Sequence, residues 1–323
     1  FFFQYLNAFF TAPRIDENTK ELVMAETRQQ MQMLNSNAMY KFFGAFLNAA
    51  TNNDPYLKNA LGYTEDYLNQ VDFNRAVQIY KERFANPADF TFIFVGNYNE
   101  KDLMQYITTY LGSLKTDPKK TEDINKDVFK PMAKESTKKV TYFGTDEQGW
   151  MGISFTSDAE YTVKNNMIST IIGDALDIYL VEIIREKMGG VYSPMAQVGL
   201  SKYPTGKFQV MVMLGCNPGK TDVLKDACVK ILNDMTKKGV DKKTLNKVKT
   251  SLISTREKNI QTNNFWLSYI NSKALYGEDF NAVNEYKDLV NSITNKDIIN
   301  FLKSYLNTNV CTRVDLLPET MKK

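Results

Sequence analysis

The chain has 323 residues, of which 43 % are apolar and 24 % are charged, and its 40 Lys and Arg against 37 Asp and Glu leave a formal net charge of +3. At roughly 150 residues per domain this length predicts about two domains. The composition excludes a disordered, collagen-like or coiled-coil protein. So small a charge excess argues against a dedicated nucleic-acid surface, so we expect no nucleic-acid partner.

The chain contains no histidine. This excludes a Ser-His-Asp triad, a Cys-His pair and a His-ligated zinc site. The three cysteines, Cys216, Cys228 and Cys311, form no C-x-x-C motif. We interpret them as buried thiols, with one disulfide as the alternative.

The cysteines leave the cellular compartment open. The periplasm or cell envelope is our working expectation, and the cytoplasm is the alternative. The apolar opening, residues 1–10, is too short to span a membrane and lacks the basic flank of a signal peptide. We therefore expect no membrane span.

Helical spacing and capping residues dominate the first third of the chain. Pro13 ends a first helix, a second begins at Asp16, and a third lies around residues 40–47. Asp72 is positioned to cap a further helix. Residues 90–95 read as a buried strand because six β-forming residues precede a Gly-Asn turn.

The pattern changes beyond residue 115. Residues 116–137 are rich in charge and contain two prolines, which is typical of an interdomain linker. We therefore predict a first domain over residues 1–115 and a second over residues 138–323.

The second domain alternates between two periodicities. A period of two predicts strands near residues 140–155, 192–200, 208–214 and 310–316, and helices are expected at 163–187 and over much of 221–307. Strands that are segregated from runs of helices predict an α+β fold, with an antiparallel sheet and helices packed on one face.

Two blocks of the sequence repeat. Ile15-Asp16 matches Val240-Asp241 at an offset of 225 residues, and Val71 matches Ile293 at an offset of 222. Two aligned blocks with nearly equal offsets predict two related domains. The second copy has about 100 residues between the linker and Val240, whereas 14 precede Ile15. We therefore expect the first copy to be truncated at its N-terminus, and a first domain that evolved short is the alternative.

A candidate site lies in residues 181–194, which read as a helix end, a turn and the start of a strand. Gly189 or Gly190 is expected to form the turn in a left-handed conformation. Arg185 and Tyr192 stand seven residues apart across it. Their guanidinium and phenol groups could donate hydrogen bonds to a peptide carbonyl or a developing oxyanion. The alternative is that Arg185 is a surface charge and Tyr192 a packed strand residue.

This stretch resembles the helix–turn–strand signature near the C-terminus of the pitrilysin/insulinase-type zinc metallopeptidases, the inverzincins. Two further stretches resemble motifs of that family in the same order, FFTAPRIDE at residues 9–17 and RFANPADFTFIFVGN at residues 83–97. The resemblance covers nearly the whole chain.

The family's zinc site is an H-x-x-E-H helix in its first domain, and this chain lacks that motif. The resemblance therefore implies the C-terminal, non-catalytic half of such an enzyme, with two domains like the family's third and fourth. It further implies that zinc is bound by the missing N-terminal half and that this chain binds none. Arg185 and Tyr192 occupy the positions of the family's Arg/Tyr pair, which contacts substrate and stabilises the transition state, and Gly189 and Gly190 form the turn between them.

The expected function is one half of a zinc endopeptidase that forms one wall of a chamber enclosing peptides. The implied partners are the N-terminal catalytic half, in the same polypeptide or a neighbouring subunit, and peptide substrates. The alternative is a non-catalytic core-like subunit or peptide-binding module of the same fold.

Overall fold

The computed structural model describes residues 1–13, 16–52, 64–117, 119, 135–145, 147–189 and 191–322. Contacts divide the chain into two compact units. Unit 1 comprises Phe1–Met33, Tyr63–Ile124 and Ile260–Glu278, and unit 2 comprises Leu34–Gly62, Asn125–Asn259 and Asp279–Lys323. The predicted linker at 116–137 lies largely outside the described residues, so the division at 115 and 138 stays a prediction.

Unit 1 is built mainly from helices. They are α1 (Phe2–Thr11), most of α2 (Glu17–Asn35), α4 (Glu65–Asn69), α5 (Phe73–Phe84), η1 (Pro87–Asp89), α6 (Glu100–Tyr106), the π-helical η2 (Ile107–Leu111) and α10 (Asn263–Tyr276). The predicted cap on α5 is confirmed, because Asp72 Oδ1 accepts hydrogen bonds from the backbone N–H groups of Asn74, at 2.8 Å, and Arg75, at 3.1 Å.

Residues 90–95 are extended but pair with no other strand of the described chain. Their aromatic side chains pack on α1 instead. Phe10 lies 5.0 Å from Phe90, and Phe3 lies 5.5 Å from Phe94, between ring centroids. The strand prediction is wrong for the described part of unit 1. Apolar alternation reports burial, whereas a strand also needs a partner that supplies its main-chain hydrogen bonds.

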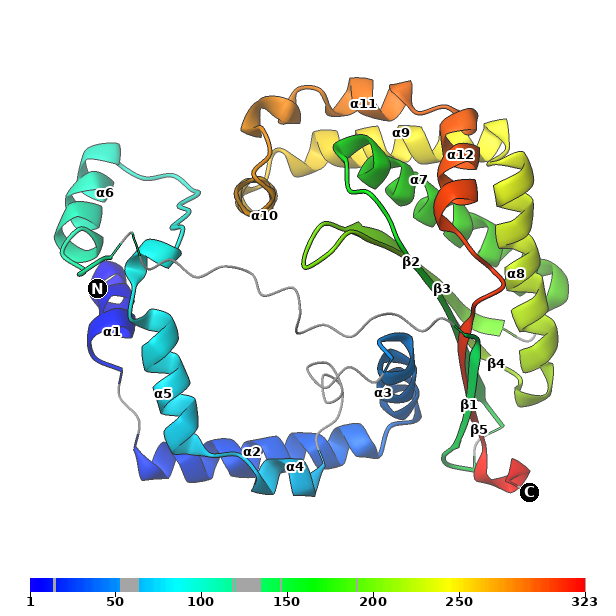
Figure 1. Cartoon of the computed structure of the whole chain (residues 1–323), viewed down its shortest axis with the longest axis horizontal. Helices are drawn as coiled ribbons and strands as arrows, with labels where there is room; N and C mark the ends of the chain where they lie inside the picture. Colours follow the sequence, from blue (N-terminus) through cyan, green and yellow to red (C-terminus); the bar gives the residue numbers. More distant parts are fainter. Residues whose placement is uncertain are drawn as a thin grey trace. The chain divides into compact units, whose positions relative to one another are not determined.

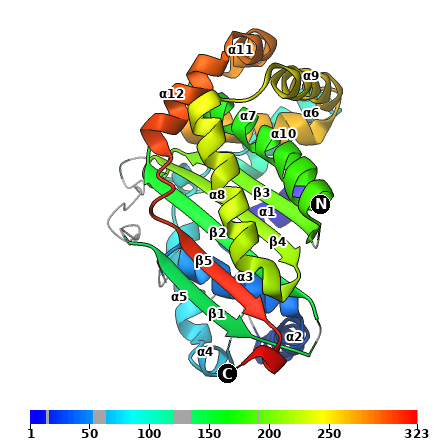
Figure 2. The ribbon, with the colours of Figure 1, turned by 90° about the vertical axis from the view of Figure 1, so that its right-hand side faces the viewer.

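Unit 2 is organised around a sheet in the order β1-β5-β2-β4-β3, which Figure 2 shows face on. Its strands are β1 (Thr137–Tyr142), β2 (Gly149–Asp158), β3 (Val191–Ser201), β4 (Lys207–Cys216) and β5 (Thr312–Leu317). The β1–β5 pair is parallel and the other pairs are antiparallel, so the sheet is mixed rather than wholly antiparallel. Strand β3 forms an edge.

One face of this sheet carries the main core. It is covered by helices α7 (Val163–Tyr179), α8 (Thr221–Lys238), α9 (Lys242–Asn259), α11 (Tyr286–Ser292) and α12 (Asn295–Tyr305). Helix α7 buries Ile171, Ile172, Ala175 and Leu176 completely. These positions form the one apolar stripe that an amphipathic helix turns toward a sheet. The predicted α+β class is confirmed.

Helix α3 (Ala38–Ala50) covers the opposite face of the same sheet, as Figure 1 shows. Phe42 and Phe46 are 0 % and 2 % exposed and pack against β4 and β5 side chains. A Cβ on Gly152 would stand 2.8 Å from Phe42 Cζ, so the glycine lets the ring reach the sheet. Helices thus cover both faces rather than one, because β4 carries apolar side chains on both faces and β5 carries them on the α3 face.

Charged residues also lie on the face covered by α8. Arg313 and Asp315 are 6 % and 2 % exposed, and Arg313 Nε donates to Asp315 Oδ1 at 2.9 Å. Arg313 Nη1 also donates to Asp222 Oδ1, in the first turn of α8, at 2.5 Å. The buried guanidinium is therefore paired, as a charge away from water must be.

The element boundaries support the internal duplication. Helices α2 and α9 begin at Glu17 and Lys242, and α3 and α10 begin at Ala38 and Asn263, each pair 225 residues apart. The extended residues 90–95 correspond, at an offset of 222, to β5. Helix α3 of the first repeat belongs to unit 2, and α10 of the second belongs to unit 1. The two repeats therefore exchange a helix.

The packing of α3 gives a first prediction. Phe42→Ala removes a fully buried ring, and we expect it to lower the free energy of unfolding by about 3–5 kcal/mol in denaturant titrations. Met39→Ala, a control on the exposed side of the same helix, should change it by less than about 0.5 kcal/mol. Equal effects of the two substitutions would contradict the packing of α3 on the sheet.

The start of α12 gives a second prediction. Hydrogen bonds from Lys164 and Thr294 lower the pKa of Asp297 to about 2, and Thr294 and Asp297 form a capping box. Because this pKa lies below that of the unfolded chain, the carboxylate stabilises the fold above about pH 4, and this contribution is lost as the pH falls to about 2. Asp297→Ala should cost about 1–2 kcal/mol at pH 7 and much less near pH 2.

The control for this prediction is Asp288→Ala, an exposed carboxylate in the first turn of α11. It should have little effect at either pH. A cost for Asp297→Ala that is the same at pH 7 and pH 2 would rule out the electrostatic account.

Candidate functional site

The predicted helix over residues 163–187 is present, but it changes character near its end. Helix α7 passes directly into the π-helix η4 (Leu180–Met188). π-Helical segments are rare and frequently mark functional sites. Leu180 and Ile184 are fully buried, and Arg185 is exposed on the same segment. The sequence spacing did not distinguish this π-helix from an α-helix.

Arg185 lies on the outer side of η4. Its guanidinium forms no hydrogen bond or ion pair with any other residue that the structure describes. Lys187 accompanies it in the last turn of η4. A cation at this position interacts favourably with the partial negative charge of the helix C-terminus, so the helix end itself gives Arg185 some stabilisation. Its donors remain available to an incoming acceptor.

Tyr192 is the extra residue of a β-bulge. Val191 pairs with Cys216 and Ser193 pairs with Gly215, so Tyr192 has no partner of its own in the β3–β4 ladder. Bulges re-aim side chains and are common beside active sites. The Tyr192 side chain is 64 % exposed, whereas Val191 is buried. Tyr192 is therefore not a packed strand residue, although the sequence left that alternative open.

The turn between the two residues begins at Gly189, whose φ of +63° confirms a glycine in a positive-φ conformation. Its ψ of 172° lies outside the left-handed helical region that we expected. A Cβ at this position would meet open space, so the backbone alone requires glycine. Gly190, the second predicted turn residue, lies outside the described residues.

A side chain of α7 ties the helix to β3. Asp177 Oδ1 accepts a hydrogen bond from the backbone N–H of Ala196 at 2.8 Å. Helix and strand approach closely, since a Cβ on Gly173 would lie 3.2 Å from Val198 Cβ. Pro194 has no N–H to offer. The middle of this free sheet edge is therefore protected against pairing with another strand.

Partial burial raises the pKa of Asp177 above its ordinary value, and the Ala196 hydrogen bond opposes that rise. The pKa of Asp174, one turn earlier, is also raised, first by burial and then by the charge of Asp177.

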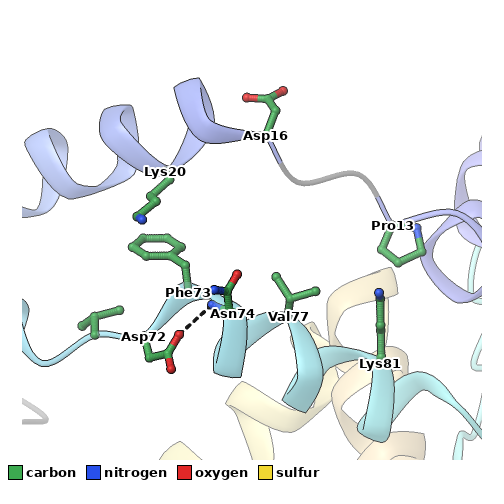
Figure 3. A pocket seen from close by; sticks show the side chains of 9 residues that line it. Pro13, Asp16, Lys20, Asp72, Phe73, Asn74, Val77 and Lys81 are labelled. Carbon is green, nitrogen blue, oxygen red and sulfur yellow. Dashed lines mark hydrogen bonds between the residues drawn. The ribbon is translucent and has the colours of Figure 1, made fainter.

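Hollows also lie elsewhere in the described chain. One, of about 470 Å³, lies in unit 1 between the start of α2 and the start of α5 (Figure 3). The Lys20 ammonium stands 5.4 Å from the ring centroid of Phe73, and Asp72 caps α5. Lys20 and Asp72 thus serve local structure, and none of the predicted site residues lines this hollow.

The second hollow, of about 400 Å³, lies in unit 2 beside α7, η4 and the α8–α9 connection. The Tyr179 hydroxyl donates to Asp241 Oδ2 at 2.8 Å. The pKa of Asp241 is lowered to about 2, mainly by hydrogen bonds from Thr244. Asp241 is thereby committed to the start of α9, so we do not place the site here.

The described residues offer no site for a metal ion, because no group of three or more His, Cys, Asp or Glu side chains gathers among them. The cysteines are free, and Cys216 and Cys228 are buried as expected, while Cys311 is half-buried. Burial raises the pKa of both Cys216 and Cys228 to about 12, so neither thiol is a ready nucleophile.

Across the part of the chain that the structure describes, no helix has both the length and the apolar character that crossing a membrane requires.

Fold and site together define an α+β repeat whose described residues hold no cluster of metal ligands. The sequence profile of the family described as "Peptidase M16 inactive domain" matches residues 74–252, more than half of the chain. The chain belongs to this family, which confirms the resemblance seen in the sequence.

Comparisons with individual proteins agree with this family. The chain is 24 % identical over 261 residues to the probable zinc protease PqqL of Escherichia coli (strain K12), covering 78 % of this chain and 27 % of the relative. The crystal structure of periplasmic protease PqqL from Escherichia coli superposes with a TM-score of 0.80 and 21 % identity, over 98 % of this chain and 34 % of that one. The chain thus spans about a quarter to a third of the length of these relatives.

The first half of the same Escherichia coli protease also superposes, with a TM-score of 0.71 and 14 % identity, over 99 % of this chain and 70 % of that one. The fold alone therefore does not tell one half from the other.

The exposure of the candidate residues gives a third prediction. Tyr192→Phe and Arg185→Ala should each change the free energy of unfolding by less than about 0.5 kcal/mol, because neither removes buried apolar area. Gly189→Ala should lower it by about 1 kcal/mol or more, because alanine is strained at positive φ. Thermal unfolding measures all three, and a cost for Tyr192→Phe as large as for Gly189→Ala would contradict the exposed placement.

Proposed function

We propose that this chain is the non-catalytic half of a zinc endopeptidase, that it forms one wall of a chamber enclosing peptides, and that it donates Arg185 and Tyr192 to the substrate. One observation carries the proposal. An exposed guanidinium and an exposed phenol flank a single turn, one on a π-helix and the other on a β-bulge, and neither donor group is engaged elsewhere in the described chain.

The chemistry of the two groups fits a peptide substrate. A peptide carbonyl oxygen accepts hydrogen bonds, and it gains negative charge as its carbon is attacked. Donors in fixed positions stabilise that charge more than the neutral carbonyl, and this difference accelerates the reaction. Tyr192 offers one hydroxyl donor for this role. Arg185 offers a planar fork of donors, suited to holding the peptide in place.

Zinc does not fit the described residues, given the missing histidines and the absence of a ligand cluster among them. In this proposal the metal belongs to the N-terminal catalytic half, in the same polypeptide or a neighbouring subunit. The contribution of this chain is confined to donors and surface. We place the complete protein in the periplasm, in line with the Escherichia coli protease of similar fold, and the cytoplasm remains the alternative.

A second function is a peptide-binding module or core-like subunit without any catalytic role. The match to an inactive-domain family favours it, as does the lack of a metal cluster in the described part of the chain. The two functions differ in whether Arg185 and Tyr192 affect turnover.

The fourth prediction therefore concerns turnover of the full-length polypeptide. Tyr192→Phe removes one donor and should lower kcat on a peptide substrate by about 10²–10³-fold. Arg185→Ala should mainly raise KM. The controls are Tyr98→Phe, another exposed tyrosine, and Lys187→Ala on the same π-helix, and both should leave the kinetics unchanged. Normal turnover for Tyr192→Phe together with Arg185→Ala would overturn the catalytic proposal and favour the binding module.

The chain by itself gives a fifth prediction. Without a suitable ligand set it should retain no stoichiometric zinc after dialysis and cleave no peptide. Elemental analysis and a fluorogenic peptide assay measure the two properties. Bound zinc together with chelator-sensitive cleavage would contradict the assignment of the metal to the other half.

A further inference from the structure

We propose that Asp177 is a positioning residue that fixes Arg185 and Tyr192 relative to each other through its hydrogen bond to the backbone of Ala196. The inference rests on the proposed function of that pair. It assigns no direct contact with substrate to Asp177 itself.

The geometry places this hydrogen bond at the base of the segment that carries both residues. Asp177 lies in the last turn of α7, and Ala196 lies 19 residues later on β3. Between them the chain runs through η4, the turn at Gly189 and the bulge at Tyr192. The hydrogen bond links the two ends of this segment, with Asp177 Oδ1 on the helix 2.8 Å from the Ala196 nitrogen on the strand.

Apolar packing alone would not fix this segment along the direction of the strand. Ile184 and Val191 anchor its two arms in the core, but the hydrophobic effect is non-directional. A hydrogen bond to one particular amide is directional and selects one register of helix against strand. Register matters here, because a displacement of about 1 Å in a positioning group can cost about 10²-fold in rate.

Ala196 is suited to this role because its N–H is not needed within the sheet. Strand β3 is an edge, and this N–H donates to Asp177 rather than to β4. The tether can therefore be removed from either side without breaking the β3–β4 ladder. Asp177→Leu removes the acceptor, and Ala196→Pro removes the donor at an edge position where proline is tolerated.

The carboxylate is held at a cost, since partial burial disfavours its charged form and raises its pKa. An asparagine would supply the same acceptor oxygen in nearly the same shape without a charge. Asp177→Asn is therefore the conservative variant that should preserve positioning.

The test uses the full-length polypeptide and measures kcat and KM on a peptide substrate for single and double variants. We expect Asp177→Leu and Ala196→Pro each to lower kcat about 10- to 10²-fold with a smaller effect on KM, and Asp177→Asn to retain most of the activity. In a Tyr192→Phe background, Asp177→Leu should add little, because a residue that acts through Tyr192 is coupled to it.

The outcomes separate this inference from the proposed function. If Tyr192→Phe alone has normal turnover, the proposed function fails and this inference fails with it. If Tyr192→Phe lowers kcat but Asp177→Leu does not, the proposed function stands and positioning by Asp177 is overturned. The same conclusion follows if Asp177→Leu lowers kcat by the same factor in the parent protein and in the Tyr192→Phe variant. Failure of Asp177→Asn to rescue kcat while its thermal unfolding matches that of the parent protein would also overturn it.

Discussion

The unit 2 sheet is buried on both faces, and this burial holds the candidate site in place. Strand β4 presents apolar side chains alternately to the core under α7 and α8 and to α3, and β5 presents Val314 and Leu316 to α3. A sheet enclosed on both faces is close-packed and resists deformation. Strand β3 inherits that rigidity through its ladder with β4. The turn carrying Arg185 and Tyr192 thus projects from a fixed edge, which is what an oriented pair of donors requires.

The same constraint links the two repeats. The face that α3 covers belongs to the sheet of the second repeat, although α3 itself is part of the first. Its counterpart α10 belongs to unit 1, and Leu267, which stands where α3 has the buried Phe42, is 46 % exposed. A repeat that lends a helix to its neighbour is not an independent folding unit. The two units defined by contacts therefore differ from the two domains that the change in composition near residue 115 predicts.

Much of this fold follows from local patterns. The helix starts at Glu17, Ala38 and Phe73, the cap at Asp72 and the strands of unit 2 were predictable, because periodicity and capping depend on nearby residues. The π-helix and the bulge were not, since their sequences also satisfy an α-helix and a regular strand. The burial of Arg313 was not predictable either, because it depends on α8, some 90 residues away in the chain. Helix α8 covers a face of β5 that carries charged side chains and therefore looks exposed in the sequence.

In the proposed function, Arg185 and Tyr192 together engage one peptide group of a substrate. The most direct measurement is a structure of the full-length polypeptide with a non-cleaved peptide bound. The account predicts that the Tyr192 hydroxyl and the Arg185 guanidinium both lie within hydrogen-bonding distance, about 2.7–3.1 Å, of oxygen atoms on the same stretch of peptide backbone. A bound peptide that leaves both side chains in contact with solvent alone would contradict it.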